Sequence, residues 1–167
     1  MADRKLAFAS VSAPTFTLAS LATSSTLVAG RESDAVDNTT NKYLDFSVTW
    51  KIRTGTSPTA NKSIELWVVP VLDGGTTYPD VFDGTDSAET ATSRDILRGC
   101  ARLAASVLTS STSDVDYFLH CPSIAELFGG FVPEKFSYFV THDTGVNLNS
   151  TGGNHVGYMR GLYETVA

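Results

Sequence analysis

An alternation of apolar and polar residues over residues 43–53 constrains the fold of this chain more than any other feature. In YLDFSVTWKIR, every second residue from Leu44 to Ile52 is apolar, and the residues between them carry hydroxyl groups or charges. Successive side chains of a β-strand point to opposite faces, so this period of two predicts a strand with one face on the core. Strands of this kind are typical of antiparallel sheets that are covered on one side.

The next segment, KSIELWVVPVLDGG, is apolar on both faces from Trp67 to Val71 and predicts a strand that is covered on two sides. Pro70 lacks an N–H group, so an edge position or a bulge is expected near residue 70. Other alternating segments predict strands over 115–121, 135–141 and 156–166, with weaker candidates over 16–22 and 26–28.

Residues 93–109, SRDILRGCARLAASVLT, satisfy both the helix and the strand template. Gly99 costs a helix roughly 1 kcal/mol relative to Ala, so we expect a strand over about 100–109, with a short helical turn before it; helix and strand both stay open for 94–104. A second short helix is predicted from Ser123 to Phe128, because Ser123 can cap it and Glu126 follows three residues later.

These elements predict an all-β fold, an antiparallel β-sandwich or jelly roll with one or two short helices. We expect residues 1–15 to form an extended N-terminal arm and residues 16–167 to form a single β-sandwich domain. The two longest connections are expected over 30–42 and 73–93. Connections as long as the second are uncommon without a role, and contact with a partner is the usual one.

Charge and hydropathy exclude several partners. The net charge of −6 would repel a polyphosphate backbone, so no nucleic acid is expected. The apolar stretch near the N-terminus is broken and is not expected to act as a signal peptide. No segment approaches the roughly 20 apolar residues that span a bilayer, so no membrane is expected as a partner. Cys100 and Cys121 are expected to be reduced and buried.

The segment 73–89 is the most acidic part of the chain. Its carboxylates could offer oxygen ligands to calcium, but their spacing does not match a calcium-binding loop. We favour a solvated acidic loop and predict no metal site and no cofactor, while cation binding by this loop stays an open alternative. The carboxylates are those of Asp73, Asp80, Asp83, Asp86 and Glu89.

No pattern of catalytic residues is present in the sequence. His120, His142 and His155 lack the spacings that metal sites often use, and His120 and Cys121 should lie on opposite faces of a strand. We expect the histidines at the surface or in turns. Neither a nucleophile elbow nor a phosphate-binding loop is found, so the chain is expected to be non-enzymatic, with no catalytic residues.

Three stretches of the chain resemble a group of short virion structural proteins of tailed bacteriophages, of the capsid decoration or cement type. They are LVAGRESDAVDNTTNKYLDFSVTWKIRTGTSPTANKSIELWV, YFLHCPSIAELFGGFVPEKFSYFVTHDTGVNLNSTGGNHVGYMRGLY and the N-terminus rich in small residues. The resemblance implies a protein that binds between major capsid subunits and stabilises the head. It would be made in the host cytoplasm and lie on the capsid exterior of the virion. Symmetric oligomers suit such positions, and a homotrimer is favoured over a dimer.

Two segments are the candidates for contact with the major capsid protein, the N-terminal segment and the loop 73–93. The alternative function is a tail-associated adhesin or carbohydrate-binding module, in which Tyr43, Trp67 and Tyr78 would stack on sugar rings. The candidate capsid contacts are Arg4, Lys5, Phe8, Tyr78, Asp80, Phe82 and Asp83.

Overall fold

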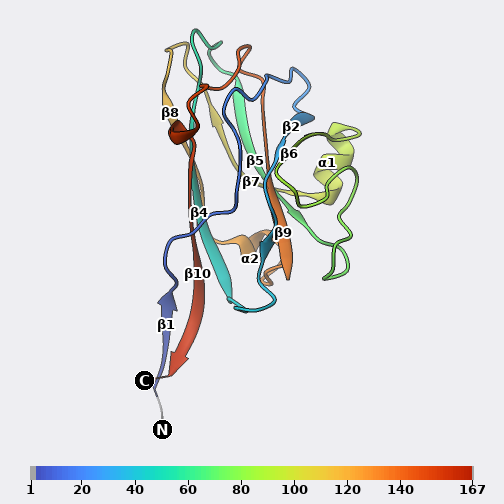
Figure 1. The fold of residues 1–167 in the computed structure, drawn as a ribbon, viewed down its shortest axis with the longest axis vertical. Helices are drawn as coiled ribbons and strands as arrows, with labels where there is room; N and C mark the ends of the chain where they lie inside the picture. The colour runs from blue at the N-terminus through green and yellow to red at the C-terminus, as the bar shows by residue number, and fades with distance from the viewer. Residues whose placement is uncertain (1–2, 167) are drawn as a thin grey trace.

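The computed structural model describes residues 3–166 and shows a sandwich of two antiparallel sheets (Figure 1). Sheet A has the strand order β1–β10–β4–β8, and sheet B has the order β6–β2–β9–β5–β7, with β3 also paired to β9. Sheet A consists of β1 (Arg4–Phe8), β4 (Asp45–Arg53), β8 (Asp116–Cys121) and β10 (Val156–Val166). Sheet B consists of β2 (Ala29–Glu32), β3 (Val36–Asp37), β5 (Ser63–Pro70), β6 (Ser87–Thr90), β7 (Arg102–Leu108) and β9 (Lys135–His142). The all-β sandwich is therefore confirmed.

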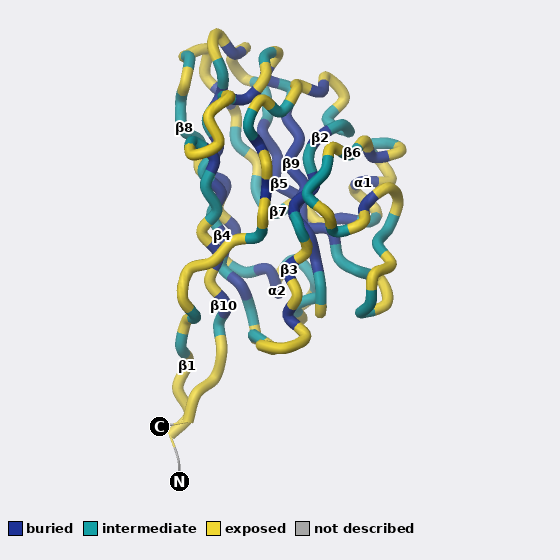
Figure 2. Tube along the Cα trace, viewed as in Figure 1, coloured by how far each residue is buried: buried dark blue, intermediate teal, exposed yellow. Residues whose placement is uncertain are grey.

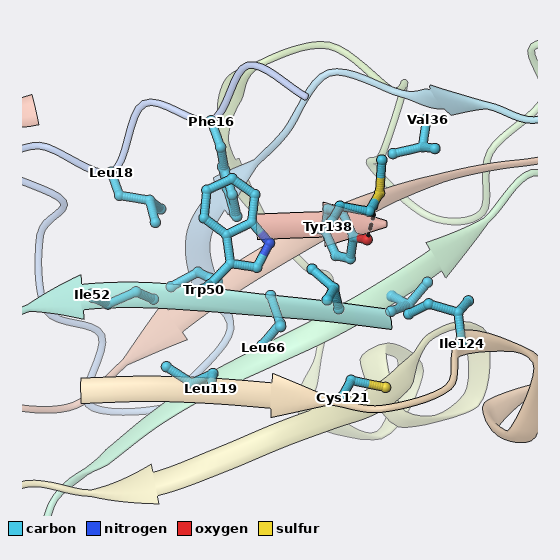
Figure 3. Packing of buried hydrophobic residues seen from close by; sticks show 14 of the residues in the cluster. Phe16, Leu18, Val36, Trp50, Ile52, Leu66, Leu119, Cys121, Ile124 and Tyr138 are labelled. Carbon is cyan, nitrogen blue, oxygen red and sulfur yellow. Dashed lines mark hydrogen bonds between the residues drawn. The ribbon is translucent and has the colours of Figure 1, made fainter. Parts of the chain in front are cut away.

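The predicted alternation in β4 is confirmed residue by residue. Its apolar side chains are buried between the sheets, and its polar side chains are half-buried on the outer face of sheet A. Trp50 lies at the centre of this core (Figure 3), with its ring edge-on to Phe16 at 4.9 Å and to Tyr138 at 5.9 Å between centroids. Such edge-to-face pairs add to the stabilisation that burial alone provides.

Sheet B is covered on both faces, as predicted for the strand over Trp67–Val71. Its inner face packs on sheet A, and β5 and β9 are buried along almost their whole length (Figure 2). A second apolar cluster lies on the outer face, where Trp67 and Phe139 contact side chains of the segment 72–101. This segment, expected to serve contact with a partner, therefore also covers the sheet.

The irregularity expected near residue 70 lies instead beside the middle of β5, and its extra residue belongs to β7. Leu66 pairs with Ala105 and Trp67 pairs with Leu103, so Ala104 is the unpaired residue of a bulge. Pro70 is the last residue of the strand and lies past Val68, the last residue that pairs with β7. The ladder with β7 thus needs no N–H group from Pro70.

Residues 93–109, which fit both a helix and a strand pattern, form a short helix and then a strand. Helix α1 (Arg94–Cys100) is capped by Ser93, whose hydroxyl accepts from the Ile96 N–H at 3.1 Å, and β7 follows directly. The expected strand and the helical turn before it are both confirmed. Helix α2 (Ile124–Leu127) is also confirmed, with the Ser123 hydroxyl accepting from the Glu126 N–H at 3.1 Å. One further turn of 3-10 helix spans Gly152–Asn154.

The predictions for the first forty residues were wrong in part. Neither 16–22 nor 26–28 is a strand, although Phe16 and Leu18 are buried in the core from an irregular segment. The expected connection 30–42 instead contains part of β2 and all of β3. At Gly30 a Cβ would lie 2.1 Å from the Val140 carbonyl oxygen, so β2 can approach β9 only because that position has no side chain.

The residues predicted as an N-terminal arm begin with a strand of sheet A. β1 pairs with the end of β10 from Arg4 opposite Val166 to Phe8 opposite Leu162. β4 pairs with β10 only as far as Leu162, so residues 4–8 and 162–166 continue beyond the sandwich as a two-stranded ribbon (Figure 1). We call these two segments the ribbon. Within residues 3–166, no helix has both the length and the apolar character needed to cross a membrane.

The contact between Gly157 and Trp50 allows a test of the core. A Cβ at Gly157 would lie 2.5 Å from the Trp50 ring, whereas a Cβ at Gly152 would meet nothing within 4 Å. We expect Gly157→Ala to lower the free energy of unfolding by roughly 1–3 kcal/mol, because the ring must move within a packed core. Gly152→Ala is the control and should change stability little. Urea unfolding measures both, and equal stabilities of the two variants would contradict this account of the core.

Candidate docking surface

One face of the ribbon carries a stripe of exposed apolar side chains. Residues directly opposite each other in an antiparallel pair share a face. On the outer face of sheet A, Leu6 and Phe8 are 68% and 51% exposed, and Val166 at the end of β10 is 66% exposed. The remaining residues of this face are Arg4, Leu162 and Glu164.

Two arginines border this stripe. The Arg4 guanidinium lies 3.3 Å from the Glu164 carboxylate, but both side chains are well exposed, so this ion pair contributes little to stability. The Arg160 guanidinium lies over the Phe8 ring at 4.9 Å, and its Nε donates to the Ala9 carbonyl oxygen at 3.1 Å. Arg160 therefore holds the Phe8 ring on the outer face while half of its surface stays open to a partner.

A hollow of about 480 Å³ lies where the ribbon leaves the sandwich. Tyr43 forms part of its wall and is fixed by ring contacts with Phe46 at 5.3 Å and with Tyr163 at 6.1 Å. A Cβ at Gly161 would lie 2.4 Å from the Tyr43 ring, so this wall requires a glycine in β10. The lining residues are Ala9, Asn41, Lys42, Tyr43, Leu44, Tyr163 and Glu164.

A second hollow shares Lys42 and Tyr43 with the first and extends to Val132. Leu44 lines the first hollow and is 54% exposed. Phe131 is the residue before Val132 in the chain and is 79% exposed. The hollows border the other face of the ribbon, because Tyr163 lies opposite Ala7 and the Tyr43 ring packs on Gly161, which pairs with the buried Phe46. We call the outer face of the ribbon, with its apolar stripe, the docking surface. Exposed apolar groups that recur on one part of a surface are typical of interaction sites.

The structure does not bring the two groups of predicted contact residues together. Arg4, Lys5 and Phe8 are exposed on the ribbon, with Lys5 on the face opposite Arg4 and Phe8. The residues predicted from the loop 73–93 lie instead in the segment that covers the outer face of sheet B (Figure 1).

Among the loop candidates, Phe82 is buried with its ring 5.2 Å from Phe139, so we leave it out of the docking surface. Tyr78 is half-buried, and burial, followed by the charge of Glu32, raises the pKa of its hydroxyl to about 12. Asp80 and Asp83 are exposed, but each accepts a hydrogen bond from a backbone N–H, from Thr92 at 2.9 Å and from Thr85 at 2.9 Å. These two carboxylates therefore hold the conformation of the loop.

The other carboxylates of the acidic loop also have separate partners. Asp73 accepts from Gly75 N–H at 2.8 Å, and the Ser87 hydroxyl donates to Glu89 at 2.7 Å. Burial raises the pKa of Asp86, but hydrogen bonds from Arg31 and Thr17 outweigh it, and the net pKa is lowered. Within residues 3–166 no group of three or more His, Cys, Asp or Glu side chains is placed to hold a metal ion.

Sequence reasoning missed the buried carboxylate of Glu32. It accepts from the Ser137 hydroxyl at 2.5 Å and from the Gly84 and Asp83 N–H groups at 2.9 and 3.1 Å. Burial raises the pKa of Glu32 despite these bonds. The carboxylate ties the acidic loop to sheet B, and no local pattern around Glu32 in the sequence signals this long-range role.

The prediction that the histidines lie at the surface or in turns holds for two of the three. His120 is exposed and Cys121 is buried, which confirms their opposite faces, and both cysteines are free. His155 lies in the turn that follows Gly152–Asn154, although its side chain is buried. His142 is the last residue of β9 and is fully buried, contrary to prediction. The two ring nitrogens of His142 lie 3.0 Å from the Thr144 hydroxyl and 3.1 Å from the Leu21 carbonyl oxygen.

Comparison with known proteins adds no assignment. Scans of protein-family models and searches of curated proteins and of solved structures find no match to this chain.

The burial of His142 makes stability depend on pH. Burial lowers the pKa of His142 to about 4, whereas the unfolded chain takes up the same proton near 6.5. The unfolded state binds more protons between these values, so this group lowers the free energy of unfolding as pH falls through that window. At pH 5 its loss relative to pH 7 should be about 2 kcal/mol.

Urea unfolding of the wild type and of His142→Gln at pH 7 and pH 5 measures this contribution. Burial also lowers the pKa of His155 and raises that of Glu32, so both groups add their own pH dependence to stability. Only the difference in the free energy of unfolding between the wild type and the variant isolates the contribution of His142. The variant should lose less stability than the wild type on acidification. The same loss in both proteins would exclude His142 as the source.

Proposed function

We propose that the protein is a non-enzymatic decoration, or cement, protein of a tailed bacteriophage, which binds between adjacent major capsid subunits and stabilises the head. It is made in the host cytoplasm and binds to the outside of the capsid. The docking surface forms the contact with the major capsid protein.

The ribbon is the observation that carries this proposal. Five residue pairs at about 3.4 Å per residue extend for roughly 17 Å, enough to follow a seam between neighbouring subunits. Leu6, Phe8 and Val166 remain exposed along this length instead of packing on the sandwich. A ladder of backbone hydrogen bonds holds the ribbon in one conformation, so little ordering entropy is lost when its apolar stripe binds.

A capsid built from many identical subunits can be stabilised by contacts that are individually small. Each copy offers a small apolar stripe bordered by charged side chains, and many copies on one particle add their effects. The sandwich supplies the stiffness that a cement protein needs, because its two sheets are joined by one continuous core.

The second candidate function is a tail-associated adhesin or carbohydrate-binding module. Of the aromatic residues expected to stack on sugars, Trp67 is buried and donates its indole N–H to Glu65 at 2.9 Å. Tyr78 packs against Gly84, whose missing side chain makes room for the ring. Only Tyr43 lines an open hollow, together with Tyr163 and the polar groups of Asn41, Lys42 and Glu164. That hollow is what favours this alternative.

Binding to undecorated heads of the phage that encodes this chain tests the cement function. We expect the double variant Leu6→Ser/Phe8→Ser to lose at least tenfold in affinity, because it removes the apolar stripe and keeps the backbone ladder. Phe118→Ser is the matched control, since Phe118 is 60% exposed on β8, away from the ribbon. Cosedimentation and circular dichroism measure occupancy and folding.

Full occupancy by the folded double variant would remove the ribbon from the capsid contact. Absence of wild-type binding to heads, combined with binding to a glycan array that is lost in Tyr43→Ala, would replace the cement function by the adhesin.

A further inference from the structure

The outer edge of β1 has no partner strand among residues 3–166. β1 is the end strand of sheet A and pairs on one side only, with β10. Four of its five residues are exposed, and Ala7 is half-buried. An edge of this kind presents a row of unpaired backbone donors and acceptors to solvent.

The pairing with β10 determines which backbone groups this edge presents. The Ala9 N–H donates to the Gly161 carbonyl oxygen at 2.8 Å. Hydrogen-bonded and non-hydrogen-bonded pairs alternate along an antiparallel ladder, so Ala7 and Lys5 also direct their backbone groups toward β10. The N–H and C=O groups of Arg4, Leu6 and Phe8 consequently point to the open edge.

We propose that two copies of this chain pair through β1 in antiparallel orientation, about a two-fold axis at Leu6. Leu6 of each copy then faces Leu6 of the other, and Arg4 faces Phe8. In this register all three outward-facing residues exchange hydrogen bonds across the interface, which gives six in total. The two copies of sheet A become one continuous sheet.

Charge selects this arrangement from the alternatives. A parallel pairing would place Arg4 and Lys5 beside their own copies, and an antiparallel pairing centred on Lys5 would place two lysines opposite each other. Like charges directly opposite one another destabilise a strand pair. The register centred on Leu6 opposes no like charges, and it places each guanidinium beside an aromatic ring. A register centred on Ala7 places Arg4 opposite Ser10, which lies beyond the end of β1.

The proposed pairing predicts a dimer in place of the trimer expected from the sequence, because the single open edge of β1 is used once in each copy. It goes beyond the proposed function and does not depend on it. The pairing uses the backbone edge of the ribbon, so the apolar stripe stays exposed and the two stripes adjoin. The dimer would thus present one apolar surface twice as wide as that of a single ribbon.

Disulfide formation tests the register in the free protein. Directly opposite residues of a hydrogen-bonded pair have Cα atoms about 5.5 Å apart, within the range that a disulfide spans. We expect Leu6→Cys to form a covalent dimer rapidly under mild oxidation. Phe8→Cys is the control, because its copies would lie at least about 14 Å apart along the strands. The wild type, with its native thiols at Cys100 and Cys121, sets the background. Equal cross-linking of both variants, or none above background in Leu6→Cys, would overturn the register.

Sedimentation equilibrium tests the pairing itself. The wild type should approach twice the chain mass of 17.8 kDa as its concentration rises. Leu6→Pro should remain a monomer, because proline removes an N–H group that faces the open edge and leaves the bonds to β10 in place. Leu6→Ala keeps the N–H group and should still dimerise. A wild type that is monomeric into the millimolar range, a trimer, or an unaffected Leu6→Pro dimer would each refute the pairing. No capsid is present in these experiments, so their outcome is independent of that of head binding.

Discussion

The rest of the structure depends on covering both faces of β5 and β9. These central strands of sheet B are buried on both sides, and exposing the apolar part of either side would cost roughly 25 cal/mol for each Å² of apolar surface. Sheet A covers one face, and the segment 72–101 covers the other through its own apolar cluster. Glu32 adds a polar anchor at the point where that segment meets the sheet. The length of the acidic connection thus has a structural reason, and its carboxylates serve mainly its own turns.

Sheet A is covered on one face only, and this difference from sheet B locates the docking surface. Only its inner face is covered, and its outer face carries the polar residues of β4. Beyond Leu162 the ribbon has lost β4 as a neighbour and is mostly exposed (Figure 2). Tyr163 on its inner face still contacts Tyr43, whereas its outer face has no such aromatic contact with the sandwich. Leu6, Phe8 and Val166 each keep half or more of their surface exposed there, although Arg160 lies over the Phe8 ring. Their exposure is explained most simply by a partner.

Local patterns were sufficient for much of this fold. The alternation in 43–53 placed β4 and its buried face, and the two-sided apolar run placed β5 inside a covered sheet. Ser123 and Glu126 located α2. Features that arise from long-range packing were not predictable in this way: the role of Phe16 as a core residue without a strand, the burial of His142, and the pairing of β1 with the other end of the chain. For the same reason Phe82 was taken for a contact residue, since its burial depends on Phe139 in another strand.

The alternation that organises the strands also separates the two surfaces of the ribbon. Side chains alternate between its faces, and backbone hydrogen-bonding groups alternate between its edges, both with a period of two residues. Leu6 and Phe8 therefore present their side chains on the outer face and their backbone groups at the open edge. One set of residues can use the edge to bind a second copy and the face to bind a larger assembly, because the two contacts involve different atoms. A ribbon that pairs in this way also loses the open edge through which unassembled copies would aggregate.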